Sequence, residues 1–135
     1  MLLAARMLNS VASVNAFDWA EQVEFTQGDT ADIYFQLIDA SVDKAVRGYV
    51  PAGRRYAPAA GATMSVKLDN IDDAIALTRA ATQPFTNDPS IWKLSVVSTD
   101  KIIGTCALAI TLTEGVKVTR GRVEAAVLIH SQATL

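Results

Sequence analysis

Few residues in this chain could carry out chemistry. The single histidine, His130, has no second histidine or cysteine at the spacing of zinc ligands. The single cysteine, Cys106, lies in an alternating apolar run, where a free cysteine usually packs as a small hydrophobic side chain. No serine lies in a Gly-x-Ser-x-Gly elbow, and no glycine-rich segment has the Gly-Lys-Ser/Thr ending of a phosphate loop. We therefore predict that the protein is not an enzyme and has no catalytic residue, cofactor or metal.

One acidic group could in principle bind a hard cation through its oxygen atoms. Asp69, Asp72 and Asp73 lie beside Asn70. The group lacks the spaced acids, the central glycine and the terminal glutamate of an EF-hand loop. Because the surrounding pattern indicates β structure, we expect a solvated turn here.

The best functional candidates lie in a segment rich in arginine and tyrosine, residues 39–61. Loops of this length without regular structure are uncommon in compact domains and are often functional. Arginine and tyrosine are enriched at protein interfaces, although the same mixture could bind nucleic acid or lie in a solvated loop. The acidic balance of the chain favours a protein contact. The candidate interface residues in this segment are Arg47, Tyr49, Arg54, Arg55 and Tyr56.

Residues 1–21 are predicted to form an N-terminal arm. Arg6 interrupts the apolar run that a signal peptide needs, and no run of about 20 apolar residues could span a membrane. The apolar spacing approximates a helical stripe, which predicts a short helix or an extended arm that docks on a neighbouring subunit. An unstructured leader, or an extension ahead of a start at Met7, is the alternative. Phe17 and Trp19 could anchor the arm by burying aromatic area, or could pack on the chain's own core.

The composition indicates one domain that associates with other chains. The chain has 135 residues, of which 50% are hydrophobic and 19% charged, with a net charge of −2. So few charges favour an oligomer, although an alanine-rich monomer would show the same numbers. A weakly acidic chain is not expected to be attracted to nucleic acid in general.

The dominant pattern is period-two alternation, which is typical of half-buried strands. In residues 105–113 it places Cys106, Leu108, Ile110 and Leu112 on one face. Gly28 and Asp29 predict a tight hairpin turn between strands at 22–27 and 30–38. Further strands are expected at 62–69, 91–99, 105–113, 116–119 and 123–129, with a strand or a short helix at 74–81. About seven strands separated by turns predict an all-β fold, an antiparallel β-sandwich over residues 22–135 that is either immunoglobulin-like or a small barrel.

Part of this pattern resembles a known family. The residues are Phe25-Thr26-Gln27-Gly28-Asp29-Thr30, followed by Ile33-Tyr34-Phe35-Gln36-Leu37-Ile38-Asp39. They resemble the opening hairpin of small structural proteins from tailed bacteriophages and are similar to the N-terminal β domain of upper baseplate proteins. The expected strands at 90–96 and 104–112 fit the same architecture. The resemblance implies a virion component, made in the cytoplasm of the bacterial host and assembled in multiple copies without a cofactor.

The leading hypothesis is a virion structural protein of the tail or baseplate. Its partners would be copies of itself in a homo-oligomer and other virion proteins, held by the arm and the loop, with no nucleic acid and no membrane. A capsid decoration protein or a head–tail connector is an alternative within the same class. A carbohydrate- or ligand-binding β module is the alternative from another class, with Trp92, Tyr49 or Tyr56 as an aromatic platform. Trp92 shares a predicted face with Leu94 and Val96, which argues for its burial.

Overall fold

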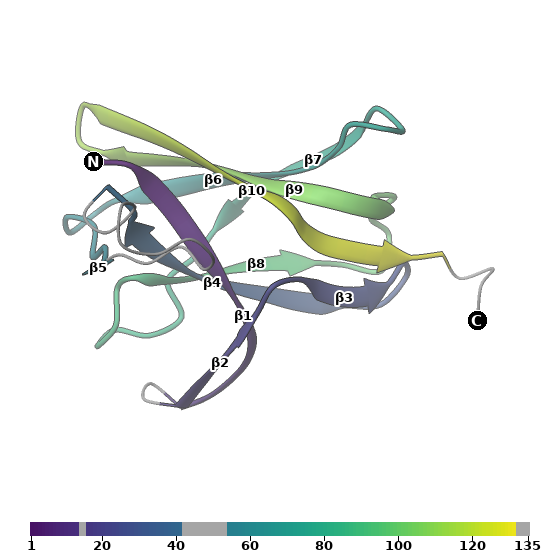
Figure 1. Ribbon diagram of the computed structural model, residues 1–135, viewed down its shortest axis with the longest axis horizontal. Coiled ribbons are helices and arrows are strands. Elements are labelled where there is room, and N and C mark those ends of the chain that lie inside the picture. The colour runs from purple at the N-terminus through teal and green to yellow at the C-terminus, as the bar shows by residue number, and fades with distance from the viewer. Residues whose placement is uncertain (14–15, 42–53, 132–135) are drawn as a thin grey trace.

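The computed structural model describes residues 1–13, 16–41 and 54–131, with only the backbone given for residues 9–13 and 16–19. These residues form ten strands in two sheets and no helix (Figure 1). The predicted all-β class is confirmed, and the two facing sheets are consistent with a sandwich. There are more strands than the seven expected. The part of the chain that is described has no helix long and apolar enough to cross a membrane.

The first sheet is built around β4. β1 pairs with β4 along one edge, and β2 pairs with the other edge of β1. β8 and the short β5 both pair with the remaining edge of β4, one after the other along its length. All of these pairings are antiparallel. The strands are β1 (Leu3–Ser13), β2 (Ala16–Ala20), β4 (Ala31–Asp39), β5 (Arg54–Arg55) and β8 (Ile91–Val96).

The second sheet has the order β3-β10-β9-β6-β7. Its strands are β3 (Val23–Thr26), β6 (Thr63–Asn70), β7 (Ile75–Ala81), β9 (Gly104–Glu114) and β10 (Lys117–His130). The pairing of β3 with β10 is parallel, so the expectation of a wholly antiparallel sandwich was wrong at this edge. The segment at 74–81, for which the sequence allowed a strand or a short helix, is the strand β7.

The core lies between the sheets, and the residues buried in it confirm the inward faces that the alternation predicted for four strands. Side chains that the sequence assigned to one face of each strand are at most 3% exposed, because each inward face contacts the facing sheet rather than water. They are Ile33, Phe35 and Leu37 on β4, Met64, Val66 and Leu68 on β6, Trp92, Leu94 and Val96 on β8, and Cys106, Leu108, Ile110 and Leu112 on β9.

The turn at Gly28 and Asp29 forms, but it does not join a hairpin. Gly28 has φ 96°, and the Asp29 amide donates to the Thr26 carbonyl at 3.0 Å. The strands on either side of the turn belong to different sheets, so the expected hairpin between them was wrong. The reason is the partner of β3, since β10 continues beside it and the Gln27 amide donates to the His130 carbonyl at 2.8 Å.

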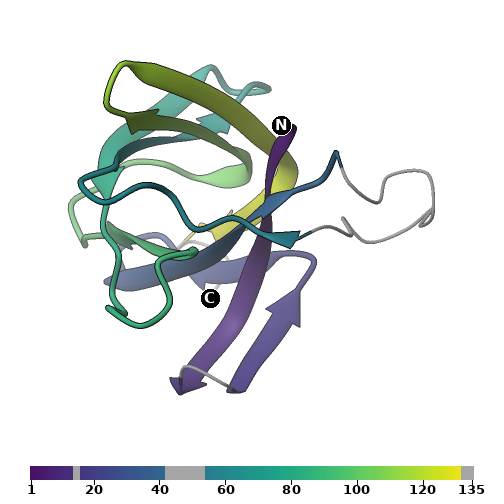
Figure 2. The ribbon, with the colours of Figure 1, turned by 90° about the vertical axis from the view of Figure 1, so that its left-hand side faces the viewer.

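The N-terminal segment is a strand and not the expected short helix. Its first half pairs with β4 from Leu3↔Asp39 to Leu8↔Tyr34, and it buries Leu3, Ala5 and Met7 in the core of this same chain. Those three residues are spaced two apart, as in a strand, whereas the prediction gave more weight to the approximate helical spacing of the apolar residues. Beyond Leu8 the strand continues with β2 as its partner, and the β1–β2 hairpin projects away from the two sheets (Figure 2).

The last strand is longer than the sequence indicated. The two expected strands at 116–119 and 123–129 are parts of one strand, β10, whose register against β9 shifts between Val123 and Val127. Ala125 lies in this bulge with φ 50° and is exposed, while its neighbour Ala126 is buried. Simple alternation over 123–129 would place Ala125 on the buried face with Val127 and Ile129. That expectation is wrong, because β10 has two more residues than β9 between Val123 and Val127, and this bulge turns Ala125 outward.

Two contacts join the borders of the sheets. Thr82, just after β7, exchanges backbone hydrogen bonds with Lys93 on β8, at 3.0 and 2.7 Å. At the opposite border β1 passes over β10 at Gly121, where a Cβ atom would lie 2.5 Å from the Leu3 carbonyl oxygen. Only a residue without a side chain fits under this crossing.

Arg79 of β7 adds a third connection. Its guanidinium donates to the Asp100 carboxylate through both terminal nitrogens, at 2.7 and 2.9 Å, and to the Ser95 carbonyl at 2.9 Å. The hydrogen bond from Arg79 lowers the pKa of Asp100 and raises that of Arg79 itself. The second sheet is thereby tied to the end of β8 and to the turn that follows it.

We predict that Gly121→Ala destabilises the fold by roughly 2 kcal/mol, the usual scale for overpacking. The added methyl meets backbone at the crossing of β1 and β10, and backbone cannot rotate away. Chemical denaturation measures the change, with Ser65→Ala on an exposed strand position as the control. Equal stabilities for Gly121→Ala and the wild type would contradict the close crossing.

We predict that Asp100→Asn costs about 1 kcal/mol at neutral pH, a modest value because Arg79 is one-third exposed. The lowered pKa of Asp100 means that its stabilisation is complete above about pH 4, the usual carboxyl pKa, and is lost as the pH falls through the folded value. Thermal unfolding from neutral to acid pH should therefore show the variant and the wild type converging. A constant difference at every pH would refute the ion pair, and Asp29→Asn provides the exposed control.

Candidate functional site

The structure describes only some of the seven predicted interface residues. Arg47 and Tyr49 lie outside the described residues. Phe17 and Trp19 are described by their backbone alone, on β2, in register with Val11 and Leu8 of β1. Their predicted roles as anchors therefore stay predictions.

Arg54 and Arg55 form the short strand β5 at the base of the 39–61 segment. They pair with Asp39 and Ile38 of β4, so the two described ends of this segment lie side by side in the sheet. Both arginines are exposed. The Arg55 guanidinium lies 3.7 Å from the buried carboxylate of Asp88, a distance at which the charges attract without a short hydrogen bond.

Tyr56 has an internal partner. Its hydroxyl lies 2.7 and 2.8 Å from the two carboxylate oxygens of Glu114, which also accepts the Ala59 amide at 2.9 Å. The Ala59 amide, and then the Tyr56 hydroxyl, hold the pKa of Glu114 below its usual value, while the carboxylate raises the pKa of Tyr56. Tyr56 therefore holds the segment after β5 against the end of β9.

The acidic group forms the expected turn between β6 and β7. The buried Asn70 donates to the Ile103 carbonyl at 2.5 Å and to Asp73 at 3.1 Å, and it accepts the Asp73 amide at 3.3 Å. Asn70 and Asp73 are thus occupied in bracing the turn. In the described part of the chain no three histidine, cysteine or acidic side chains are grouped as metal ligands.

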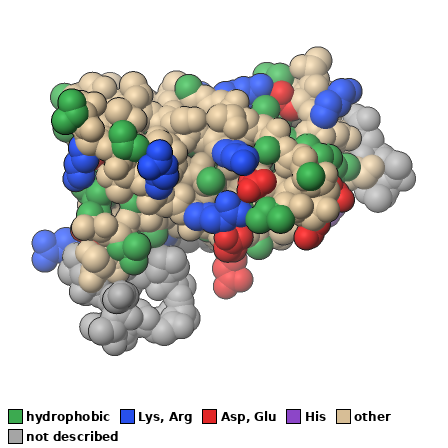
Figure 3. All heavy atoms as spheres, turned by 90° about the horizontal axis from the view of Figure 1, so that it is seen from above, with side chains coloured by type: hydrophobic (Ala, Val, Ile, Leu, Met, Phe, Trp, Pro, Cys, Tyr) green, Lys and Arg blue, Asp and Glu red, His purple; other side chains and the backbone are tan. Residues whose placement is uncertain are grey.

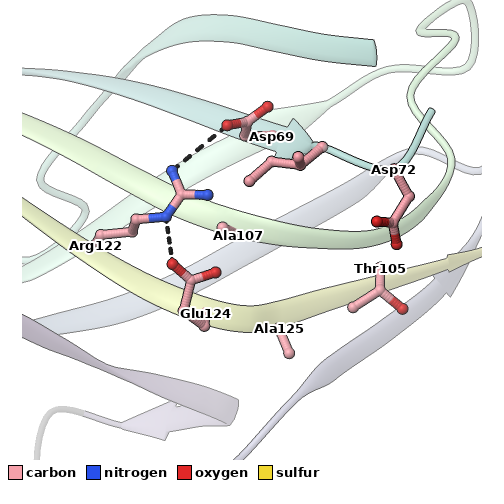
Figure 4. A pocket seen from close by; sticks show the side chains of 8 residues that line it. Asp69, Asp72, Thr105, Ala107, Arg122, Glu124 and Ala125 are labelled. Carbon is pink, nitrogen blue, oxygen red and sulfur yellow. Dashed lines mark hydrogen bonds and ion pairs between the residues drawn. The ribbon is translucent and has the colours of Figure 1, made fainter. Parts of the chain in front are cut away.

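Beside this turn lies a shallow pocket of about 220 Å³. Arg122 of β10 extends between Asp69 and Glu124 and forms an ion pair with each (Figure 4). The pocket is lined by Asp69, Ile71, Asp72, Thr105, Ala107, Arg122, Glu124 and Ala125. Three carboxylates against one guanidinium make its lining acidic, and Ile71 is 65% exposed.

The other residues considered for chemistry or ligand binding, His130, Cys106 and Trp92, are all part of the strands. His130 lies 3.0 Å from Glu24 at a partly exposed site on the two parallel strands β10 and β3. Burial raises the pKa of the Cys106 thiol to about 11, so it stays protonated at neutral pH and is a poor nucleophile. Trp92 is 2% exposed and provides no aromatic platform at the surface.

The projecting hairpin was not identified as a sheet element from the sequence. β1 pairs with β4 only as far as Leu8, yet its pairing with β2 continues to Ser13. β2 is the outermost strand of its sheet, and its other edge faces no strand of the described chain. A free strand edge offers backbone donors and acceptors to another chain.

No family model matches this chain, and neither do any curated proteins or solved structures. The functional argument therefore depends on the chain's own residues. They offer a projecting strand edge, two exposed arginines on β5 and an acidic pocket with an exposed isoleucine.

We predict that Tyr56→Phe destabilises the fold by about 1 kcal/mol, the usual net value of a hydrogen bond. Because the pKa of Tyr56 is raised, this stabilisation is present below about pH 10 and is lost as the pH rises through the folded value. An ultraviolet titration should show one tyrosine ionising late, and Glu114→Gln should restore a normal titration. Unchanged stability together with a normal tyrosine titration in the wild type would rule out the anchor.

Proposed function

We propose that this protein is a virion structural protein of a tailed bacteriophage, which assembles in multiple copies in the tail or baseplate. The sandwich serves as a rigid body, and the β1–β2 hairpin and the 39–61 segment contact neighbouring copies and other virion proteins. The proposal includes neither nucleic acid nor membrane among the partners.

The observation that carries this proposal is the hairpin beyond Leu8. A two-stranded ribbon is at best marginally stable by itself in water, and this one extends past the strand that supports its base. Pairing with a strand of a neighbouring copy would satisfy the backbone groups on its free edge and would stabilise the ribbon.

Two further observations support an assembly role. Residues that could carry out chemistry contribute to the fold instead: Cys106 is buried in the core, and Asn70 and Asp73 brace the β6–β7 turn. The sequence of residues 25–39 also resembles phage structural proteins, although β3 and β4 do not form the hairpin that this resemblance implies. We further propose the small-barrel form of the sandwich over the immunoglobulin-like one, because the Thr82–Lys93 bridge links the two sheets at one border.

The test shortens the hairpin without touching the core. Removing residues 1–20 would also remove Leu3, Ala5 and Met7 from the core, so we replace residues 9–18 by Asn-Gly. This leaves the Leu8↔Trp19 pair joined by a two-residue turn of the favoured type. Light scattering on a size column should show an oligomer for the full chain and a folded species of lower mass for the variant.

A matched variant shortens the 39–61 segment by replacing residues 42–53 with Asn-Gly. Asp39 and Arg54 then remain paired across a short loop. A loss of mass in this variant would assign part of the contact to the 39–61 segment. A monomeric full chain at every concentration, or an unchanged mass in both variants, would contradict the proposed self-assembly through these elements.

A further inference from the structure

The exposed large hydrophobic residues lie at the two ends of the sandwich. β6 and β9 are antiparallel, so the turn after β6 and the turn after β9 lie at opposite ends of the second sheet. Figure 1 shows the N-terminus and the β9–β10 turn at one end, and the β6–β7 turn at the other. Among the described residues the exposed ones are Met1, Leu2, Val116 and Val118 at the first end, and Ile71 and Val97 at the second.

The first end is basic. Val116 is at the tip of the β9–β10 turn and is fully exposed, with Lys117 and Arg120 following it on β10. Neither cation has an ion-pair partner within the described chain. The Glu114 carboxylate, which accepts hydrogen bonds from Tyr56 and Ala59, is an acid at this end and attracts Lys117. Figure 3 shows blue and green side chains at this end, with further blue ones along the rest of the molecule.

The second end is acidic. Asp72 and Asp73 follow the exposed Ile71, and Asp29 lies in the turn before β4 at the same end. Asp72 and Ile71 also line the acidic pocket of about 220 Å³, in which Arg122 is already neutralised by Asp69 and Glu124. In Figure 3 acidic side chains lie in the middle and toward this end, together with basic ones.

We propose that the β9–β10 turn of one copy docks into the Ile71 pocket of the next copy. Val116 would cover Ile71, while Lys117 would approach Asp72 and the acidic lining. This inference rests on the proposed assembly function and names a second contact for it, made by residues that are separate from the β1–β2 hairpin.

The charges at the two ends favour a head-to-tail arrangement of the copies over a two-fold one. A two-fold contact that brought the same end of two copies together would place like charges against one another. Joining the basic end to the acidic end pairs apolar with apolar and cation with anion. Such a head-to-tail contact uses two different surfaces, so it builds a ring if it closes and a filament if it does not.

The test exchanges the charges. Lys117→Glu and Asp72→Lys should each weaken self-association of the full chain at least about tenfold, and the double variant should recover it because the pair is re-formed with reversed signs. Lys67→Glu, on an exposed position of β6 away from both ends, makes the same charge change and should have no effect. Sedimentation velocity over a concentration series measures the association, which should also weaken as salt rises from about 0.05 to about 0.5 M.

Equal association of the wild type and the two single variants would overturn this contact, as would a double variant that stays weak. If the shortened hairpin dissociates the protein while Lys117→Glu does not, this contact is refuted and the proposed function stands. A wild-type chain that is monomeric at every concentration refutes both. Thermal unfolding of each variant confirms that only association has changed, since both side chains are exposed.

Discussion

The packing of β1 is the constraint on which the rest of the structure depends. Its inward side chains complete the core beside β4, and its backbone crosses β10 so closely that only Gly121 fits beneath Leu3. The strand is thus held by hydrogen bonds to one sheet and by direct contact with the other. With the Thr82–Lys93 bridge at the opposite border, this crossing keeps the two sheets in a fixed arrangement.

The same strand creates the most prominent surface feature. Once β1 separates from β4 after Leu8, it has only β2 to pair with, and the ribbon leaves the body of the molecule. The base of the 39–61 segment has the opposite character, because β5, the Tyr56–Glu114 contact and the Arg55–Asp88 pair hold it at several points.

Much of the fold could be predicted from the sequence because alternation is a local signal. The buried faces of β4, β6, β8 and β9 were all correct. The choice of partner strands could not be predicted, since it depends on contacts between residues far apart in the chain. This is why the Gly28 turn was expected to close a hairpin when β3 instead pairs with β10.

In the candidate site, too, residue types could be recognised from the sequence, but the contacts between distant residues could not. Tyr56 was recognised by its type, but its role depends on Glu114, which is 58 residues away. The pocket at Ile71 combines residues of three strands and one turn, and no spacing in the sequence predicts it. The bulge at Ala125 likewise required the structure, because the two extra residues of β10 between Val123 and Val127 depend on its pairing with β9.

The most direct test of the account is hydrogen–deuterium exchange of the wild-type chain, measured in dilute and in concentrated solution. The claim is that the hairpin edge pairs between copies, so the amides of residues 9–13 and 16–20 should exchange much more slowly in the concentrated sample. The amides of β6 and β9, buried inside the sandwich, should exchange equally slowly in both samples. Identical exchange of the hairpin amides at both concentrations would contradict the account.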